Sequence, residues 1–127
     1  MILQWKFNGN QPVYMQIMEQ IRGAIIMEEF PPGSRILPVR EFAAQAQVNP
    51  NTMQRALLEL EREGLLISCG TMGRFVTDDP NILENMRQAA YGAAIRASAA
   101  QFRAMGLSVK QAAQMLLELE QEEEDHG

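Results

Sequence analysis

The feature that most constrains the fold of this chain is a sharp turn between two short amphipathic segments. Asn49 is a favoured helix N-cap and Pro50 a favoured first helical residue, so a helix must begin at that point. An apolar line at helical spacing follows, and the residues just before the turn show the same spacing. Two helices joined by a tight turn are therefore predicted, the first over residues 38–46 and the second over residues 50–63.

The segments around this helix pair predict a winged helix-turn-helix. Apolar spacing predicts another helix over residues 12–28, which stops before a Pro-Pro-Gly turn. After Gly64, which is placed to end the third helix, two short runs at 65–69 and 74–77 are rich in Leu, Ile, Phe and Val. The Gly-Thr-Met-Gly sequence between them favours a small hairpin. This order of elements predicts a winged helix-turn-helix domain over residues 1–77.

Residues 78–127 follow as a region of different composition. An Ala-rich helix is predicted over residues 82–105 and ends at Gly106, and Ser108 with Gln111 forms a capping-box signature for a last helix. We expect these helices to lie antiparallel and to form a two-helix dimerisation region with an acidic tail. The predicted fold class is therefore mostly α with a small β-hairpin.

Large apolar side chains on the two C-terminal helices need a surface to pack against. A small monomer could hardly cover them, which indicates a second copy of the chain. The alternative is an ordinary core helix within one chain, which would show the same pattern. About 45 residues are too few to enclose an effector pocket of several hundred Å³, and the sequence names no effector. The candidate dimerisation residues are Leu83, Tyr91, Ile95, Phe102, Leu116 and Leu119.

The net charge of −5 does not exclude a nucleic-acid partner, because the charge is unevenly distributed. Residues 1–77 hold seven basic and seven acidic side chains, whereas residues 78–127 hold four basic and nine acidic ones. A neutral domain with its arginines on one surface can meet a phosphate backbone while an acidic segment points elsewhere. No stretch approaches the roughly 18 apolar residues of a membrane span. We therefore expect a cytoplasmic protein without membrane contact.

The sequence offers little to catalysis or to metal binding. Its single cysteine, Cys69, excludes an internal disulfide and every multi-cysteine zinc site, and its single histidine is His126. We therefore expect no enzyme, no cofactor and no metal site. Cys69 is predicted to fill the core on the apolar side of a strand, and His126 to belong to a disordered tail.

The helix after the sharp turn begins with side chains suited to reading bases. Asn51, Thr52, Gln54 and Arg55 are expected to face outward, whereas Met53 faces the core. Asn and Gln can form two hydrogen bonds with adenine, Arg can form two with guanine, and the Thr methyl can touch the thymine methyl. In helix-turn-helix proteins the second helix lies in the major groove. The alternative is that these residues only cap the helix and meet solvent.

Arginines around this helix are candidates for phosphate contacts. Arg40, early in its helix, is expected to act as a charge-assisted clamp, and the alternative is an exposed ion pair with Glu41 or Glu19. Arg35 and Arg74 are secondary candidates. The glycine-rich hairpin tip would let backbone N–H groups approach a phosphate or a minor groove, although a plain tight hairpin needs the same glycines.

Five motifs follow one another along the N-terminal part of the chain. They are Pro12-Val13-Tyr14-Met15-Gln16-Ile17, Pro32-Gly33, Arg40-Glu41-Phe42-Ala43, Val48-Asn49-Pro50-Asn51-Thr52 and Gly73-Arg74-Phe75-Val76. Residues 11–77 thereby resemble the DNA-binding domain of GntR-family bacterial transcription regulators, and the fourth motif is similar to the YtrA-like branch in particular. The short two-helix C-terminal region is similar in kind to the dimerisation appendage of that branch.

The resemblance implies roles for particular residues. The positions used for operator contact in the family match Arg40, Asn51, Thr52, Arg55 and the wing around Gly73. One position departs from the family pattern. Where the family commonly has Leu-Pro-Ser, this chain has Ile-Leu-Pro, so Pro38 removes a hydroxyl that could cap the helix or bond a phosphate.

We therefore expect a homodimeric, cytoplasmic transcription regulator, a repressor, that binds double-stranded DNA at a pseudo-palindromic operator. Two-fold symmetry would place the half-sites about 10 base pairs apart, or a multiple of that distance. The resemblance suggests a neighbouring transporter operon as the target. The alternative is a winged-helix protein–protein interaction module without DNA readout. Binding to phosphates releases counterions, so the dependence of affinity on salt distinguishes the two hypotheses.

Overall fold

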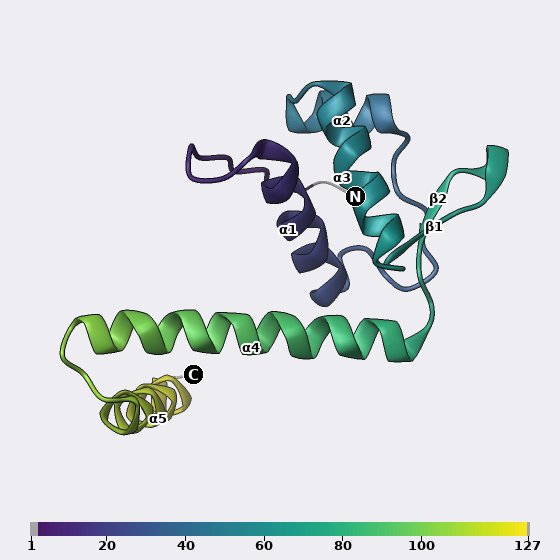
Figure 1. Cartoon of the computed structure of the whole chain (residues 1–127). Coiled ribbons are helices and arrows are strands. Elements are labelled where there is room, and N and C mark those ends of the chain that lie inside the picture. Colours follow the sequence, from purple (N-terminus) through teal and green to yellow (C-terminus); the bar gives the residue numbers. More distant parts are fainter. Residues whose placement is uncertain (1–2, 127) are drawn as a thin grey trace. The chain divides into compact units, whose positions relative to one another are not determined.

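The computed structural model describes residues 3–126, which form five α-helices and one two-stranded antiparallel hairpin (Figure 1). The fold class is mostly α with a small β-hairpin, as predicted. No helix in this part of the chain is both long and apolar enough to span a membrane. In chain order the elements are α1 (Val13–Ile26), α2 (Val39–Ala46), α3 (Pro50–Arg62), β1 (Leu66–Ser68), η1 (Gly70–Met72), β2 (Arg74–Val76), α4 (Pro80–Ala104) and α5 (Val109–His126).

The chain divides into two compact units, residues 1–86 and 87–127, so that α4 begins in the first unit and continues in the second. The first unit holds the winged helix-turn-helix and extends beyond the boundary expected after residue 77. The reason is Leu83, which is 4% exposed and belongs to the core of this unit. The first turns of α4 therefore belong to the winged-helix unit.

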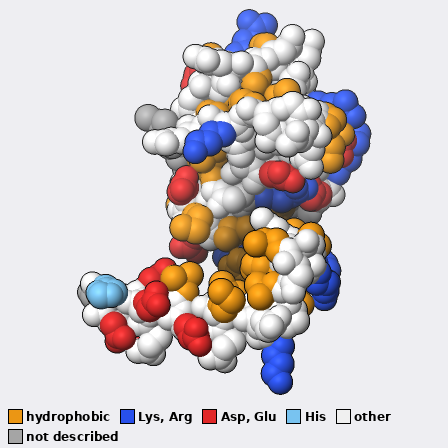
Figure 2. All heavy atoms as spheres, turned by 90° about the vertical axis from the view of Figure 1, so that its left-hand side faces the viewer, with side chains coloured by type: hydrophobic (Ala, Val, Ile, Leu, Met, Phe, Trp, Pro, Cys, Tyr) orange, Lys and Arg blue, Asp and Glu red, His pale blue; other side chains and the backbone are white. Residues whose placement is uncertain are grey.

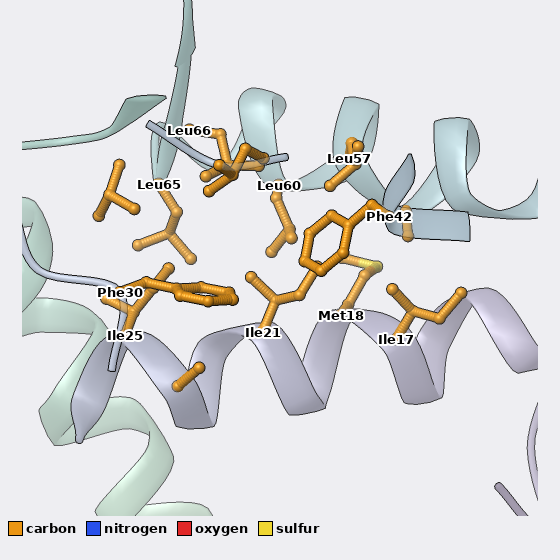
Figure 3. Packing of buried hydrophobic residues seen from close by; sticks show 14 of the residues in the cluster. Ile17, Met18, Ile21, Ile25, Phe30, Phe42, Leu57, Leu60, Leu65 and Leu66 are labelled. Atoms are coloured by element: carbon orange, nitrogen blue, oxygen red, sulfur yellow. The ribbon is translucent and has the colours of Figure 1, made fainter. Parts of the chain in front are cut away.

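Helices α1, α2 and α3 enclose the core of the first unit. Ile17, Ile21 and Ile25 of α1 and Leu57 and Leu60 of α3 are all at most 1% exposed. Figure 3 shows the α1 and α3 side chains pointing toward one another. Fully burying an aliphatic side chain of this size contributes about 1.5–3 kcal/mol, so this contact fixes which side of α3 faces inward.

The sharp turn before α3 forms as the sequence predicts. Asn49 caps α3 by accepting a hydrogen bond from the backbone N–H of Asn51 at 2.8 Å. Gln47, at the end of α2, has a φ of 58°, the left-handed conformation that lets the chain reverse abruptly. Gly64 ends α3 with a φ of 80°, which glycine adopts without steric cost.

The hairpin has a strand-like neighbour that was not apparent from the sequence. Residues 33–36 line the edge of β2 that β1 leaves open. The N–H of Gly33 donates to the carbonyl of Val76 at 2.9 Å, and the N–H of Ile36 donates to the carbonyl of Arg74 at 3.0 Å. This segment lies between the turn at Pro31 and Pro32 and the N-cap of α2 at Pro38, and it is too short to show the alternation of a strand.

Residues 3–10 dock on α1 through two glutamine side chains. Gln16 accepts a hydrogen bond from the N–H of Asn8 at 2.9 Å and donates to the carbonyl of Asn8 at 2.8 Å. Gln20 does the same with Lys6, at 3.0 and 2.8 Å. Each side-chain amide thus satisfies a backbone N–H and C=O that would otherwise need a neighbouring strand. Apolar periodicity gives no sign of such a contact.

In the second unit, α4 and α5 leave most of their apolar side chains exposed. Ser108 and Gln111 form the predicted capping box, with hydrogen bonds of 2.9 and 3.1 Å at the start of α5. Figure 1 shows α4 along its length and α5 almost end-on, so the expectation that the two helices lie antiparallel is wrong. Among the described residues of these helices, only Leu83 and Ala112 are buried.

The acidic residues at the end of the chain continue α5 to His126. The expectation of a disordered tail is therefore wrong for the described residues. Gln114 donates to Glu118 at 3.1 Å, and Gln121 donates to Asp125 at 3.3 Å, each one turn further along the helix. Such pairs, together with the high helix propensity of Glu and Gln, offset the repulsion between neighbouring carboxylates.

We expect Gln16→Ala to lower the free energy of unfolding by about 1–3 kcal/mol, because the backbone groups that Gln16 bonds lose their partners. Gln16 is 5% exposed, whereas Gln20 is only half-buried, so Gln20→Ala should cost less. Urea unfolding at one fixed protein concentration measures both. If the two variants lose the same free energy of unfolding, the burial of Gln16 does not add to the cost of removing its side chain.

Candidate nucleic-acid interface

The outward side of α3 carries the four side chains expected to read bases. Asn51 and Arg55 are exposed, Thr52 and Gln54 are half-buried, and Met53 between them is completely buried. This separation follows from helical periodicity once the inner face of α3 is packed on α1. The first turns of α3 therefore present hydrogen-bonding groups to the outside, as a helix in the major groove requires.

Arg55 is held by an aromatic ring of another helix. Its guanidinium carbon lies 3.8 Å from the centroid of the Tyr14 ring, in the first turn of α1. Such a cation–π contact contributes about 0.5–1 kcal/mol at an exposed site. No carboxylate among the described residues pairs with Arg55. Arg55 is thus oriented by Tyr14 while its N–H donors stay available, a role for Tyr14 that no local sequence pattern indicates.

Arg40 is exposed in the first turn of α2. Within residues 3–126 no acidic side chain pairs with it, so the alternative ion pair with Glu41 or Glu19 does not form. Pro38 occupies the N-cap position without a side-chain hydrogen bond. The partial positive charge of the helix start adds to that of the guanidinium, so both suit a phosphate group.

Arg35 lies against the wing because residues 33–36 run beside β2. A Cβ atom built on Gly73 would lie only 3.0 Å from Nε of Arg35, and Gly73 has a φ of 100°. Glycine is therefore required at this position both by the backbone conformation and by the close approach of the guanidinium. Arg35 is exposed, and it has no acidic partner in the described part of the chain.

Arg74 uses two of its N–H donors within the protein. Its Nε donates to Oε1 of Glu61 at 2.5 Å, and its Nη2 donates to Oε1 of Gln54 at 3.3 Å. The side chains of Arg74 and Glu61 are only 17% and 22% exposed. The sequence suggests a secondary phosphate contact for Arg74, whereas the structure shows a link between β2 and α3.

The wing tip is the short 3-10 turn η1 (Gly70–Met72). Cys69, just before this turn, is exposed, so the expectation that it fills the core is wrong. The reason is that only Leu66 of β1 is buried: Ile67 and Ser68 are already exposed, so the chain has left the core before it reaches Cys69. Among the described residues, no group of His, Cys, Asp and Glu side chains is arranged to hold a metal ion.

The candidate dimerisation residues separate into two groups. Leu83 lies in the core of the first unit, whereas Phe102 is half-buried and four others are at least 49% exposed, namely Tyr91, Ile95, Leu116 and Leu119. Figure 2 shows apolar side chains gathered where α4 and α5 meet, beside the acidic side chains of α5. A groove of about 390 Å³ lies there, lined by Phe102, Leu107, Ala112, Met115, Leu116, Glu118, Leu119 and Glu122.

Comparison with known proteins agrees with this geometry. Residues 13–76 match the family described as bacterial regulatory proteins, gntR family. The chain is 31% identical over 103 residues to the uncharacterized HTH-type transcriptional regulator YhcF of Bacillus subtilis. The aligned residues make up 81% of this chain and 85% of that protein. It is 34% identical over 71 residues to the HTH-type transcriptional repressor YtrA of the same organism. This alignment spans 56% of this chain and 55% of that protein.

Solved structures show the same fold. A GntR family transcriptional regulator from Listeria monocytogenes has a TM-score of 0.81 and 25% identity, over 88% of this chain and 98% of that one. AraR(DBD) in complex with operator ORX1 has a TM-score of 0.55 and 29% identity, over 61% of this chain and 99% of that one. The chain therefore belongs to the gntR family of bacterial regulatory proteins and is a DNA-binding transcription regulator.

Proposed function

We propose that this protein is a homodimeric, cytoplasmic transcription repressor that binds a pseudo-palindromic operator in double-stranded DNA. The observation that carries the proposal is a set of three exposed arginines without acidic partners among the described residues: Arg35, Arg40 and Arg55. They lie beside the wing, at the start of α2 and on α3, the elements with which a winged helix-turn-helix meets DNA. The relative YtrA is named a repressor, and AraR(DBD) was solved with operator DNA, which supports the proposal.

The three arginines are proposed to play different parts. Arg55 reads a base edge from the major-groove side of α3, together with Asn51 and Thr52. Arg40 clamps a phosphate, and Arg35 reaches the backbone or the minor groove beside the wing at Gly73. A neighbouring transporter operon is the proposed target, on the resemblance to the YtrA-like branch alone.

The proposed dimer is formed by the apolar surface of the second unit. Contiguous exposed apolar patches are rare on small monomers, and a second copy would present the same surface across a two-fold axis. The interface is proposed to contain Tyr91, Ile95, Phe102, Leu116 and Leu119. Leu83 is not part of it, since its side chain is buried within the first unit. A two-fold symmetric protein requires a two-fold symmetric operator.

We expect Arg55→Ala and Arg40→Ala to weaken DNA binding in different ways. Arg55→Ala should cost about 1–3 kcal/mol on the preferred operator and little on random DNA, because a base contact is lost. Arg40→Ala should weaken binding to both DNAs alike and reduce the log–log salt slope by about one unit per protomer, because a phosphate contact is lost. Titrating both variants on both DNAs over a salt series measures these effects.

Arg62→Ala is the matched control for this experiment. Arg62 lies on α3, but its side chain pairs with Glu59 at 2.5 Å, so its removal should change neither the salt slope nor the base preference by a comparable amount. If Arg55→Ala loses affinity equally on all sequences with a shallower salt slope, Arg55 is a phosphate contact. If wild-type affinity hardly depends on salt, the DNA-binding function itself is contradicted.

We expect Leu116→Glu to raise the dissociation constant of the dimer by at least about 100-fold. A symmetric interface would lose two buried leucines, each contributing about 1.5–3 kcal/mol. Gln114→Glu is the control, since it adds the same charge at an exposed polar position of α5. Sedimentation of both variants over a concentration series decides the point. A Leu116→Glu protein that sediments like the wild type would contradict the proposed interface.

A further inference from the structure

We propose that Arg74 sets the base preference of Gln54, so that Gln54 selects guanine over adenine at one position of each half-site. This inference rests on the proposed binding to an operator. It gives Arg74 a positioning role, in which a wing residue determines how a residue of α3 reads DNA.

The carboxamide oxygen of Gln54 is turned toward the wing. Nη2 of Arg74 donates to Oε1 of Gln54 at 3.3 Å, while Nε of the same guanidinium donates to Glu61 at 2.5 Å. Glu61 also lies on α3, so one β2 side chain bonds two α3 side chains at once. The Arg74 side chain is only 17% exposed, and turning it away would leave the Glu61 carboxylate without its partner.

This arrangement determines which atom of Gln54 faces outward. With Oε1 directed at a cation, the group left for DNA is Nε2, which has two N–H donors and no acceptor. The adjacent guanidinium polarises the amide and strengthens these donors. Gln54 therefore acts as a donor only, although a free glutamine side chain offers both a donor and an acceptor.

A side chain that only donates distinguishes the bases in the major groove. Guanine presents two acceptors, N7 and O6, whereas thymine presents only O4 and adenine only N7. Adenine pairs with glutamine through two bonds only if Oε1 accepts from the N6 amino group, which would then sit beside the Arg74 guanidinium. Cytosine presents an amino donor and no acceptor. The adenine contact suggested by residue type alone is therefore disfavoured for Gln54 in this structure.

Selection from random double-stranded oligonucleotides with the full-length protein tests the inference. The position read by Gln54 is identified as the one whose preference Gln54→Ala removes. In the wild type that position should prefer guanine over adenine by about fivefold or more, the lower range for one base contact. In Arg74→Met the preference should shift toward adenine, because methionine keeps the aliphatic stem but donates no hydrogen bond.

Arg62→Met is the matched control, because it removes an α3 arginine whose ion pair with Glu59 does not involve Gln54 or Arg74. It should keep the wild-type preference. A motif that Arg74→Met leaves unchanged overturns the inference. A wild-type preference for adenine at the Gln54 position also overturns the inference. This second outcome can be measured even if Arg74→Met does not fold. If the wild type enriches no motif at all, the proposed operator binding fails instead.

Discussion

The packing of α3 on α1 is the interaction on which the DNA-facing surface depends. Met53, Leu57 and Leu60 are completely buried, so α3 cannot turn about its axis without opening cavities that cost about 2–5 kcal/mol per leucine. The inward side chains thereby fix the outward ones. The same interface brings Tyr14 under the guanidinium of Arg55. One helix contact thus builds the core and also orients an arginine toward the surrounding solvent.

Much of the fold could be predicted because its signals are local. The cap at Asn49, the end of α3 at Gly64 and the capping box at Ser108 each act within a few residues, and helical periodicity needs only one turn to show. The polar face at the start of α3 follows from the same periodicity. These features would be expected of this sequence in any tertiary context that buries the apolar face.

The rest depends on contacts between residues far apart in the chain. Periodicity did not reveal the segment beside β2, the docking of residues 3–10 on Gln16, or the place of Leu83 in the first core. The candidate site shows the same limit. The sequence makes Arg40 the first candidate for a phosphate contact and Arg74 a secondary one. Only the fold shows that Arg74 bonds Glu61 and Gln54, whereas Arg40 has no acidic partner among the described residues.

This difference explains how a domain with as many acids as bases can attract DNA. Three glutamates lie in or just after the second half of α3, where they would repel phosphates, and each is paired: Glu59 with Arg62, Glu61 with Arg74 and Glu63 with Arg22. The two more exposed of these pairs, Glu59 with Arg62 and Glu63 with Arg22, contribute only about 0–1 kcal/mol each to stability. The larger effect of the three ion pairs is on the electrostatic field. They neutralise the glutamates next to the outward side of α3 and leave Arg35, Arg40 and Arg55 without a paired acid. The placement of unpaired charge, and not the net charge, thus makes this surface suited to a polyanion.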